Sequence, residues 1–322
     1  MANAAYIGYQ PLVEKIVRNE DIFCSLLFDY TNRTLRVVDF RGGNFQNKHA
    51  YLENILIKEG MRKIFTLIER DDMNGWQRVG YHREGSIPGY YKRSDAYIMS
   101  RIYDADFDAK IPQGEENLEN KGMLNDIKVV GKKLSESKDP GIKVDPISDM
   151  EVLQIIAAEQ ARRESKPAKS AAKAKKSTAA KSKKLSPPPS PEIEEGKADG
   201  LIFPQFSREV EYFHFLIQNR RSKQSNVLST EYQDCFGNAK VHFCLPIETK
   251  ADQNLAKAGL QQAIDQMLDM GAVSIFATVP ADDAKSNEVF AGCGFRNSGW
   301  LSRQLLLPEG VLDVILWTRK LV

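Results

Sequence analysis

The sequence predicts an α+β (α/β-like) fold made of two tandem copies of one unit, each a mixed central sheet flanked by helices. Three observations support this prediction. About the last seventy residues are patterned as helix, strand, helix, strand and strand, the first hundred repeat much of that pattern, and a basic, proline-rich tract interrupts the second copy. Consecutive elements of this kind pack as layers around a core.

The length of the chain allows this division. Its 322 residues are 42% hydrophobic and 27% charged, which is enough to form two ordinary cores. We expect the first copy at 1–110, a connector at 111–140 and the second copy at 141–322. A disordered insertion is expected at 165–198, where Ala, Lys, Ser and Pro replace the apolar residues that would offset chain entropy.

The first copy begins with residues 1–20, whose short amphipathic pattern fits a strand or a helix. The runs 22–28 and 34–40 are apolar and partly alternating, and they predict a β-hairpin with a turn at 29–33. Asn44 then suits the start of a helix that ends at Gly60, and a strand follows at 63–68.

An internal repeat becomes visible when Gly60 is aligned with Gly271, an offset of 211 residues. Ile64-Phe65 then aligns with Ile275-Phe276, and Asp71-Asp72 with Asp282-Asp283. After a slip of three residues, Gly80-Tyr81 matches Gly294-Phe295. The shared element order favours duplication over chance.

The stretch 104–140, which includes the connector, is polar and predicts one helix at most. A strand is expected at 142–146, followed by a helix in which Ser148 and Glu151 have the spacing of a capping box. The range 206–217 fits a helix or a strand, and 226–229 a short strand. Alternation over 238–245 predicts a central strand with Lys240, His242 and Cys244 on one face.

The end of the chain predicts a helix over 255–268, a strand over 273–279 and a second helix that begins beside Asp282 and Asp283. Two strands follow, at 299–307 and 311–321.

Several segments resemble the β-lysine N-acetyltransferase family, a branch of the Gcn5-related N-acetyltransferase superfamily. They are SNEVFAGCGF at 286–295, GWL at 299–301 and DVILWTRKL at 313–321, while GYHREGSIPGYY at 80–91 is similar to the N-terminal domain of that family. The resemblance implies a sheet in which two parallel strands splay apart and admit acetyl-CoA. It also implies acetyl transfer from acetyl-CoA to a small-molecule amine, a β-lysine-like amino acid.

The resemblance further implies where the cofactor binds. The central strand would give backbone hydrogen bonds to the pantetheine arm, and the next turn would hold the pyrophosphate. Active members carry the pattern Arg/Gln-x-x-Gly-x-Gly/Ala there, whereas this chain reads KADQNLA at 250–256, without glycine and with a negative charge at Asp252. A plain helix cap without a ligand is the alternative. The expected cofactor contacts are Leu245, Ile247, Gln253, Asn254, Leu255, Ala256, Asn287 and Phe290.

Amide formation needs a group that accepts the proton of the amine. His242, on the polar face of the central strand, is the first candidate for a catalytic base, and Glu248 just past that strand is the second. A surface or hydrogen-bonded core histidine is the alternative for His242. The four cysteines have no paired spacing, so no metal site is expected.

The basic tract from 162 to 184 suggests a second kind of function. Ten of its residues are Lys or Arg and one is Glu, a composition that binds nucleic acid or another polyanion without sequence readout. The alternative to an enzyme is therefore a non-catalytic acetyltransferase-like assembly protein that uses this tract. We expect a cytoplasmic protein with reduced thiols, no signal peptide and no membrane span.

Overall fold

The computed structural model describes residues 12–20, 22–103, 116–135, 141–164, 210–220, 224–308 and 310–322. The predicted insertion at 165–198 lies outside the described residues, as does most of the basic tract. In the first half the elements are β1 (Leu12–Arg18), β2 (Phe23–Asp29), β3 (Thr34–Asp39), α1 (Phe45–Glu59), β4 (Lys63–Ile68), η2 (Arg70–Asp72), α2 (Met73–Arg78), β5 (His82–Ile87) and β6 (Ala96–Ile102).

Helix α3 (Glu116–Ser135) follows, and the second half begins at β7. Its elements are β7 (Ile142–Ile147), α4 (Asp149–Glu164), β8 (Val210–Asn219), β9 (Ser225–Gln233), β10 (Asn238–Phe243), α5 (Lys250–Asp269), β11 (Ser274–Pro280), α6 (Ala284–Gly292), β12 (Arg296–Leu307) and β13 (Gly310–Lys320). Among the described helices, none is long and apolar enough to cross a membrane.

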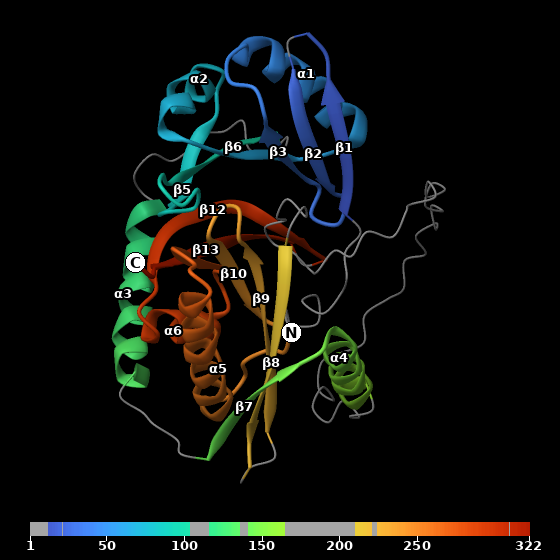
Figure 1. Ribbon diagram of the computed structural model, residues 1–322. Coiled ribbons are helices and arrows are strands. Elements are labelled where there is room, and N and C mark those ends of the chain that lie inside the picture. Colours follow the sequence, from blue (N-terminus) through green and yellow to red (C-terminus); the bar gives the residue numbers. More distant parts are fainter. Residues whose placement is uncertain are drawn as a thin grey trace, which may run out of the picture.

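All the described strands belong to one mixed sheet of 13 strands, in the order β1-β2-β3-β4-β6-β5-β12-β13-β11-β10-β9-β8-β7 (Figure 1). The two halves have the same order of strands. The first half reads β1-β2-β3-β4-β6-β5 and the second half, inward from β8, reads β8-β9-β10-β11-β13-β12. The predicted fold class, a mixed sheet flanked by helices, is confirmed. The two sheets that we expected are joined edge to edge, because β5 pairs with β12 at Gly85 and Gly299.

Several predictions that were left open are resolved. The ambiguous segments at 1–20 and 206–217 contain strands, β1 and β8. The strand expected at 226–229 is longer, because β9 runs to Gln233 through polar residues that are buried. The Ser148–Glu151 capping box is present, with the Ser148 N–H and hydroxyl donating to Glu151 at 2.8 Å each.

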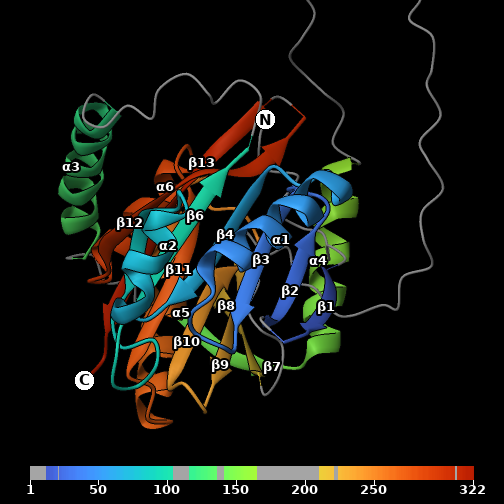
Figure 2. The ribbon, with the colours of Figure 1, turned by 90° about the horizontal axis from the view of Figure 1, so that it is seen from above.

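Four hydrophobic clusters form the core, and one of them is shared by the two halves. One lies between the first half of the sheet and α1 and α2, which cover that face in Figure 2. A second lies under α5, α6 and α3, and a small third lies under α4. The fourth contains Phe65 and Ile98 from the first half with Phe276 and Leu316 from the second. Its mixed membership shows that the two halves share a core on the sheet face away from α1 and α5.

The join between β5 and β12 leaves no space for side chains. A Cβ added to Gly85 would lie 2.8 Å from the Gly299 Cα, and one added to Gly299 would lie 2.7 Å from the Gly85 Cα. Both contacts are with backbone, which cannot move aside as a flexible side chain can. Glycine at both positions is what allows the strands to meet.

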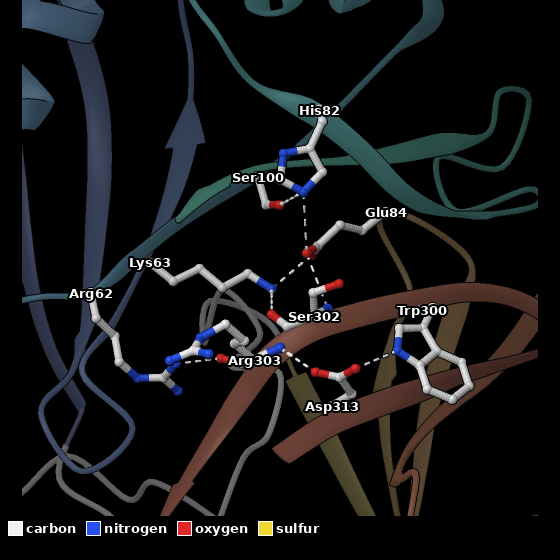
Figure 3. Close-up of polar contacts among 9 residues, drawn as sticks. All are labelled: Arg62, Lys63, His82, Glu84, Ser100, Trp300, Ser302, Arg303 and Asp313. Carbon is white, nitrogen blue, oxygen red and sulfur yellow. Dashed lines mark hydrogen bonds and ion pairs between the residues drawn. The ribbon is translucent and has the colours of Figure 1, made fainter. Parts of the chain in front are cut away.

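A buried ion pair lies beside this join (Figure 3). Lys63 Nζ is 2.7 Å from Glu84 Oε2, and their side chains are 0% and 2% exposed. Both residues also reach the second half: Lys63 donates to the Ser302 carbonyl at 2.7 Å, and Glu84 accepts from the Ser302 N–H at 3.1 Å. The pair therefore links two strands of the first half to β12.

The histidine in Figure 3 does not form a catalytic triad with its neighbours. His82 Nε2 contacts both Ser100 Oγ, at 3.2 Å, and Glu84 Oε1, at 3.6 Å. A relay needs the serine and the carboxylate on different ring nitrogens. Ser100 is also fully buried, so this group of residues has a structural role.

An irregular stretch of β12 supplies the backbone atoms that the ion pair contacts. Its pairing with β13 shifts between Leu301 and Leu305, and Arg303 has a positive φ of 52°. Asp313 of β13 supports this bulge by accepting from the Arg303 N–H at 2.6 Å and from Trp300 Nε1 at 2.7 Å. The bulge turns the backbone of β12 toward the first half.

Each half also reaches over the other with the loop region of its β-hairpin. Tyr90, between β5 and β6, accepts a hydrogen bond on its carbonyl from Asn238 Nδ2 at 3.0 Å, and its ring stacks on Phe236. In the opposite direction, the Leu306 N–H donates to Asn32 Oδ1 at 3.1 Å. The halves thus interlock through equivalent hairpins.

Candidate functional site

The parallel strands β10 and β11 part midway. They pair from Asn238–Ser274 to Lys240–Phe276 and no further, although β10 continues to Phe243 and β11 to Pro280, all within the described residues. Backbone groups beyond the last pair face a neighbouring strand without the usual ladder. This is the splayed geometry that the sequence led us to expect.

His242 lies on the parted segment of β10. Ala239 and Val241 belong to the core under α5, so alternation places Lys240 and His242 on the opposite face. There Lys240 Nζ is 3.0 Å from Glu231 Oε1, with the two side chains 3% and 1% exposed. His242 Nδ1 lies 3.8 Å from the same oxygen and makes no hydrogen bond within the described residues. A group of three ionisable residues, of which Lys240 and Glu231 are buried and His242 is half-buried, therefore lies where the strands separate.

The environment of His242 keeps its imidazole neutral. Burial lowers its pKa from 6.5 to about 3, and the nearby charges of Lys240 and His214 act in the same direction. A neutral imidazole can accept a hydrogen bond from an amine, but with this pKa it is a weak proton acceptor. His242 is therefore better suited to orienting an amine than to deprotonating it directly.

This pKa predicts a pH dependence of stability. Because the pKa is about 3 in the folded chain and 6.5 is the ordinary value, the unfolded state binds more protons between these limits. The resulting stabilisation is complete above pH 6.5 and is lost as the pH falls. From pH 7 to pH 5 the wild type should lose about 1 kcal/mol more than His242→Asn, since 29% of the side chain remains accessible. Urea unfolding at both pH values measures this, and equal losses would contradict it.

The first half provides an internal comparison for this cluster. Arg36 pairs with Phe65 as Lys240 pairs with Phe276, so the two basic residues are equivalent. Opposite Arg36 is Leu27, whereas opposite Lys240 is Glu231. The equivalent of His242 is Val38, because each faces a serine across its strand pair. The carboxylate and the imidazole are present in the second half only.

The turn expected to hold the pyrophosphate is a capped helix start. Thr249 is the N-cap of α5, and its hydroxyl accepts from the Asp252 N–H at 3.1 Å. The Asp252 carboxylate accepts from the N–H groups of Thr249, at 2.8 Å, and Glu248, at 3.2 Å. These are backbone donors of the kind that an anion would use, and here a carboxylate of the chain occupies them.

Gln253, another expected cofactor contact, binds α6. Its Nε2 donates to Glu288 Oε2 at 2.7 Å and to the Lys285 carbonyl at 3.2 Å. Lys285 Nζ in turn donates to the carbonyl of Glu248, the second candidate base, whose side chain is exposed. The start of α5 and the start of α6 are therefore tied together where β10 and β11 end.

The remaining expected cofactor contacts are mostly buried. Asn287 is fully buried, donates to the carbonyls of Pro280 and Asp283 at 2.8 Å each, and accepts from Trp317 Nε1 at 2.7 Å. The Leu245 carbonyl accepts from Asn226 Nδ2 at 3.3 Å. Asn254 is half-buried near the start of α5. The apolar side chains expected at this site lie in the core, namely Leu245, Ile247, Leu255, Ala256 and Phe290.

The glycine turn of the first half, 41–44, has a different arrangement. Gly43 and Asn44 both have positive φ, 84° and 49°, and the Asn44 side chain does not cap α1. Lys48, in the first turn of α1, reaches back to this turn: its Nζ lies 2.5 Å from Asp39 Oδ2 and donates to the Arg41 carbonyl. The lysine charge is thus already neutralised by a carboxylate at the end of β3.

The sequence did not reveal a polar chain on the face covered by α4. His214 Nε2 is 3.2 Å from Asp149 Oδ1, and its Nδ1 is 2.6 Å from Ser229 Oγ, which lies 3.1 Å from Cys244 Sγ. Ser229 is 2% exposed and so is inaccessible to a substrate. These polar contacts fix the first turn of α4 to β8 and β9. No group of His, Cys, Asp and Glu in the described part of the protein could hold a metal ion.

No protein-family model matches the chain, and no curated protein matches it. Several solved structures are similar to parts of it, and three of them are described here. A protein from Sphaerobacter thermophilus described as an acetyltransferase has 9% identity and a TM-score of 0.33, over 57% of this chain and 94% of its own. Spermidine N-acetyltransferase from Vibrio cholerae has 15% identity and a TM-score of 0.31, over 36% and 67%. The ribosomal-protein-S18-alanine N-acetyltransferase from Escherichia coli has 20% identity and a TM-score of 0.29, over 36% and 72%.

Proposed function

We propose that the chain is an N-acetyltransferase that moves acetyl from acetyl-CoA to the amine of a β-lysine-like small molecule, and that the second half carries the reaction. The parting of β10 and β11 after Lys240 and Phe276 is the observation on which this proposal depends. The thioester would reach the amine between the parted strands, as the resemblance of the C-terminal segments implies.

Three residues on or near the face of β10 that points away from α5 have defined roles in this proposal. The neutral imidazole of His242 would accept a hydrogen bond from the amine and orient it. The carboxylate of Glu231, 3.8 Å from the ring and 3.0 Å from Lys240 Nζ, would hold the ammonium of Lys240 beside the imidazole and so help to keep the ring neutral. Glu248, exposed at the end of the strand, would take the proton through solvent. The comparison with Leu27 and Val38 in the first half supports assigning these roles to one half.

The start of α5 fits the pyrophosphate poorly in this conformation, because Asp252 occupies the N–H groups of Glu248 and Thr249. That observation favours a second candidate, a non-catalytic acetyltransferase-like assembly protein that contacts a polyanion through the tract from Arg162 to Lys184. Isothermal titration with acetyl-CoA separates the two. Heat of binding below millimolar ligand, with acetylation of β-lysine or lysine followed by thiol release, supports the enzyme. No heat at millimolar ligand favours the second candidate.

The variant Asp252→Asn tests the pyrophosphate position directly. Removing one negative charge about 4 Å from a diphosphate should strengthen acetyl-CoA binding by roughly fivefold, since that repulsion is about 1 kcal/mol in water. Loss of the negative charge at the start of α5 should lower the free energy of unfolding by about 0.5 kcal/mol, because a neutral amide interacts less favourably with the helix dipole. Asp265→Asn, an exposed carboxylate on the same helix, is the control and should change neither quantity. An Asp252→Asn variant that binds acetyl-CoA no better than wild type would place the phosphates elsewhere.

A further inference from the structure

A polar clasp joins the ends of the parted strands on the side of α5 and α6. We use this name for Gln253, Lys285, Glu288 and the carbonyl of Glu248. Gln253 Nε2 donates across to Glu288 and to the Lys285 carbonyl, and Lys285 Nζ donates back to the Glu248 carbonyl. Each of these bonds crosses from the segment that follows β10 to the helix that follows β11. The clasp therefore spans the end of the strand split.

Two further contacts close the same region. The rings of Phe243 on β10 and Phe290 on α6 lie 5.6 Å apart, so they also join the two elements. Beside the clasp, Asp252 binds the N–H groups of Glu248 and Thr249. A ligand arm that runs between β10 and β11 and ends at the start of α5 would have to displace these groups.

The composition of the clasp suits a reversible contact. Lys285 is exposed and Glu288 is half-buried, so both can exchange their partners for water at small cost, whereas Gln253 is 7% exposed and its amide would reach water only when the clasp opens. Asn287, in contrast, is fully buried and bonds to two carbonyls and to Trp317. Asn287 fixes α6 to β11 and β13, which confines an opening movement to the clasp and the first turn of each helix.

We propose that the clasp is a gate that closes the entrance to the gap between β10 and β11. Acetyl-CoA then binds only to the minor population of molecules in which the clasp is open. This inference rests on the proposed function. The apparent affinity of such a site falls by the fraction of molecules that are open. Breaking a clasp bond should therefore strengthen ligand binding, even though it removes a contact from the protein.

Two variants remove the clasp from opposite sides. Gln253→Ala removes the donor on α5, and Glu288→Ala removes an acceptor on α6. Gln261→Ala is the matched control, because Gln261 is an exposed glutamine of the same helix that bonds within the helix to Asp265. By calorimetry with acetyl-CoA, we expect both clasp variants to bind about threefold to tenfold more tightly than wild type, and the control to stay within twofold.

Hydrogen exchange without ligand gives an independent measurement. Amides at 248–252 and 284–288 should exchange severalfold faster in both clasp variants than in wild type, and at an unchanged rate in the control. If wild type binds acetyl-CoA and the variants bind equally or more weakly, the gate is wrong and the proposed function stands. If no protein binds acetyl-CoA, the proposed function fails, and with it the gate. Unchanged exchange in the variants would refute the gate whatever the ligand result.

Discussion

Replacing Glu84 with glutamine should lower the free energy of unfolding by about 3–5 kcal/mol, because it leaves the ammonium of Lys63 buried without its counter-charge. Lys63 is 0% exposed and lies 2.7 Å from Glu84, and burial already lowers the pKa of this lysine. Glutamine keeps the size of the side chain, so the change tests charge rather than packing. Urea unfolding with the midpoint and slope measured separately gives the difference.

An exposed ion pair of the same half is the control for this prediction. Lys15 and Glu59 lie 2.9 Å apart with side chains 46% and 24% exposed. Lys15→Ala should change the free energy of unfolding by about 1 kcal/mol or less, because water solvates the remaining charge. A Glu84→Gln variant that loses no more than this control would show that the buried pair does not hold the halves together.

The second large effect on stability is expected at the join between β5 and β12. Gly299→Ala should destabilise the protein by about 3 kcal/mol, since the added methyl group would press on the Gly85 backbone at 2.7 Å. Gly85→Ala should cost a similar amount. The double variant should differ from the sum of the single effects, because the two added groups meet the same contact.

Gly122→Ala on α3 is the matched control for the glycine prediction. Nothing lies within 4 Å of a Cβ added there, and the residue is in a helix. Alanine should stabilise the chain by about 0.5–1 kcal/mol at this position, because it has the better helix propensity. The midpoint of thermal unfolding should be highest for Gly122→Ala, lower for wild type, and lowest for Gly85→Ala and Gly299→Ala. Equal midpoints for Gly299→Ala and wild type would mean that β5 and β12 are not in close contact.

The sequence predicted those elements whose pattern is local. The strand at 63–68 and the helix that ends at Gly60 match the structure to within a residue, because apolar periodicity and a left-handed glycine mark them directly. The extent of β9 was underestimated, since Glu231 reads as a surface residue. It is buried because Lys240 on the next strand neutralises it, and that pairing is not encoded in either segment alone.

The join between the halves could not be predicted for a similar reason. Gly85 and Gly299 are more than two hundred residues apart, and each alone is compatible with an ordinary turn or bulge. In the candidate site, the position of His242 on the polar face followed from alternation. The engagement of Asp252 with the two preceding N–H groups and of Gln253 with α6 did not, because both depend on how the chain folds back at the end of β10.

The two halves interlock through equivalent hairpins, as two subunits of a symmetric dimer could, but here they belong to one chain and differ in sequence. In such a dimer, a substitution that adds a charge on one side adds it on the other as well. Covalent fusion removes that constraint. Leu27 and Val38 in the first half can therefore be apolar, while Glu231 and His242 at the equivalent positions of the second half are ionisable. A substitution can thus change the chemistry of one half while the other half keeps the surface that packs against it.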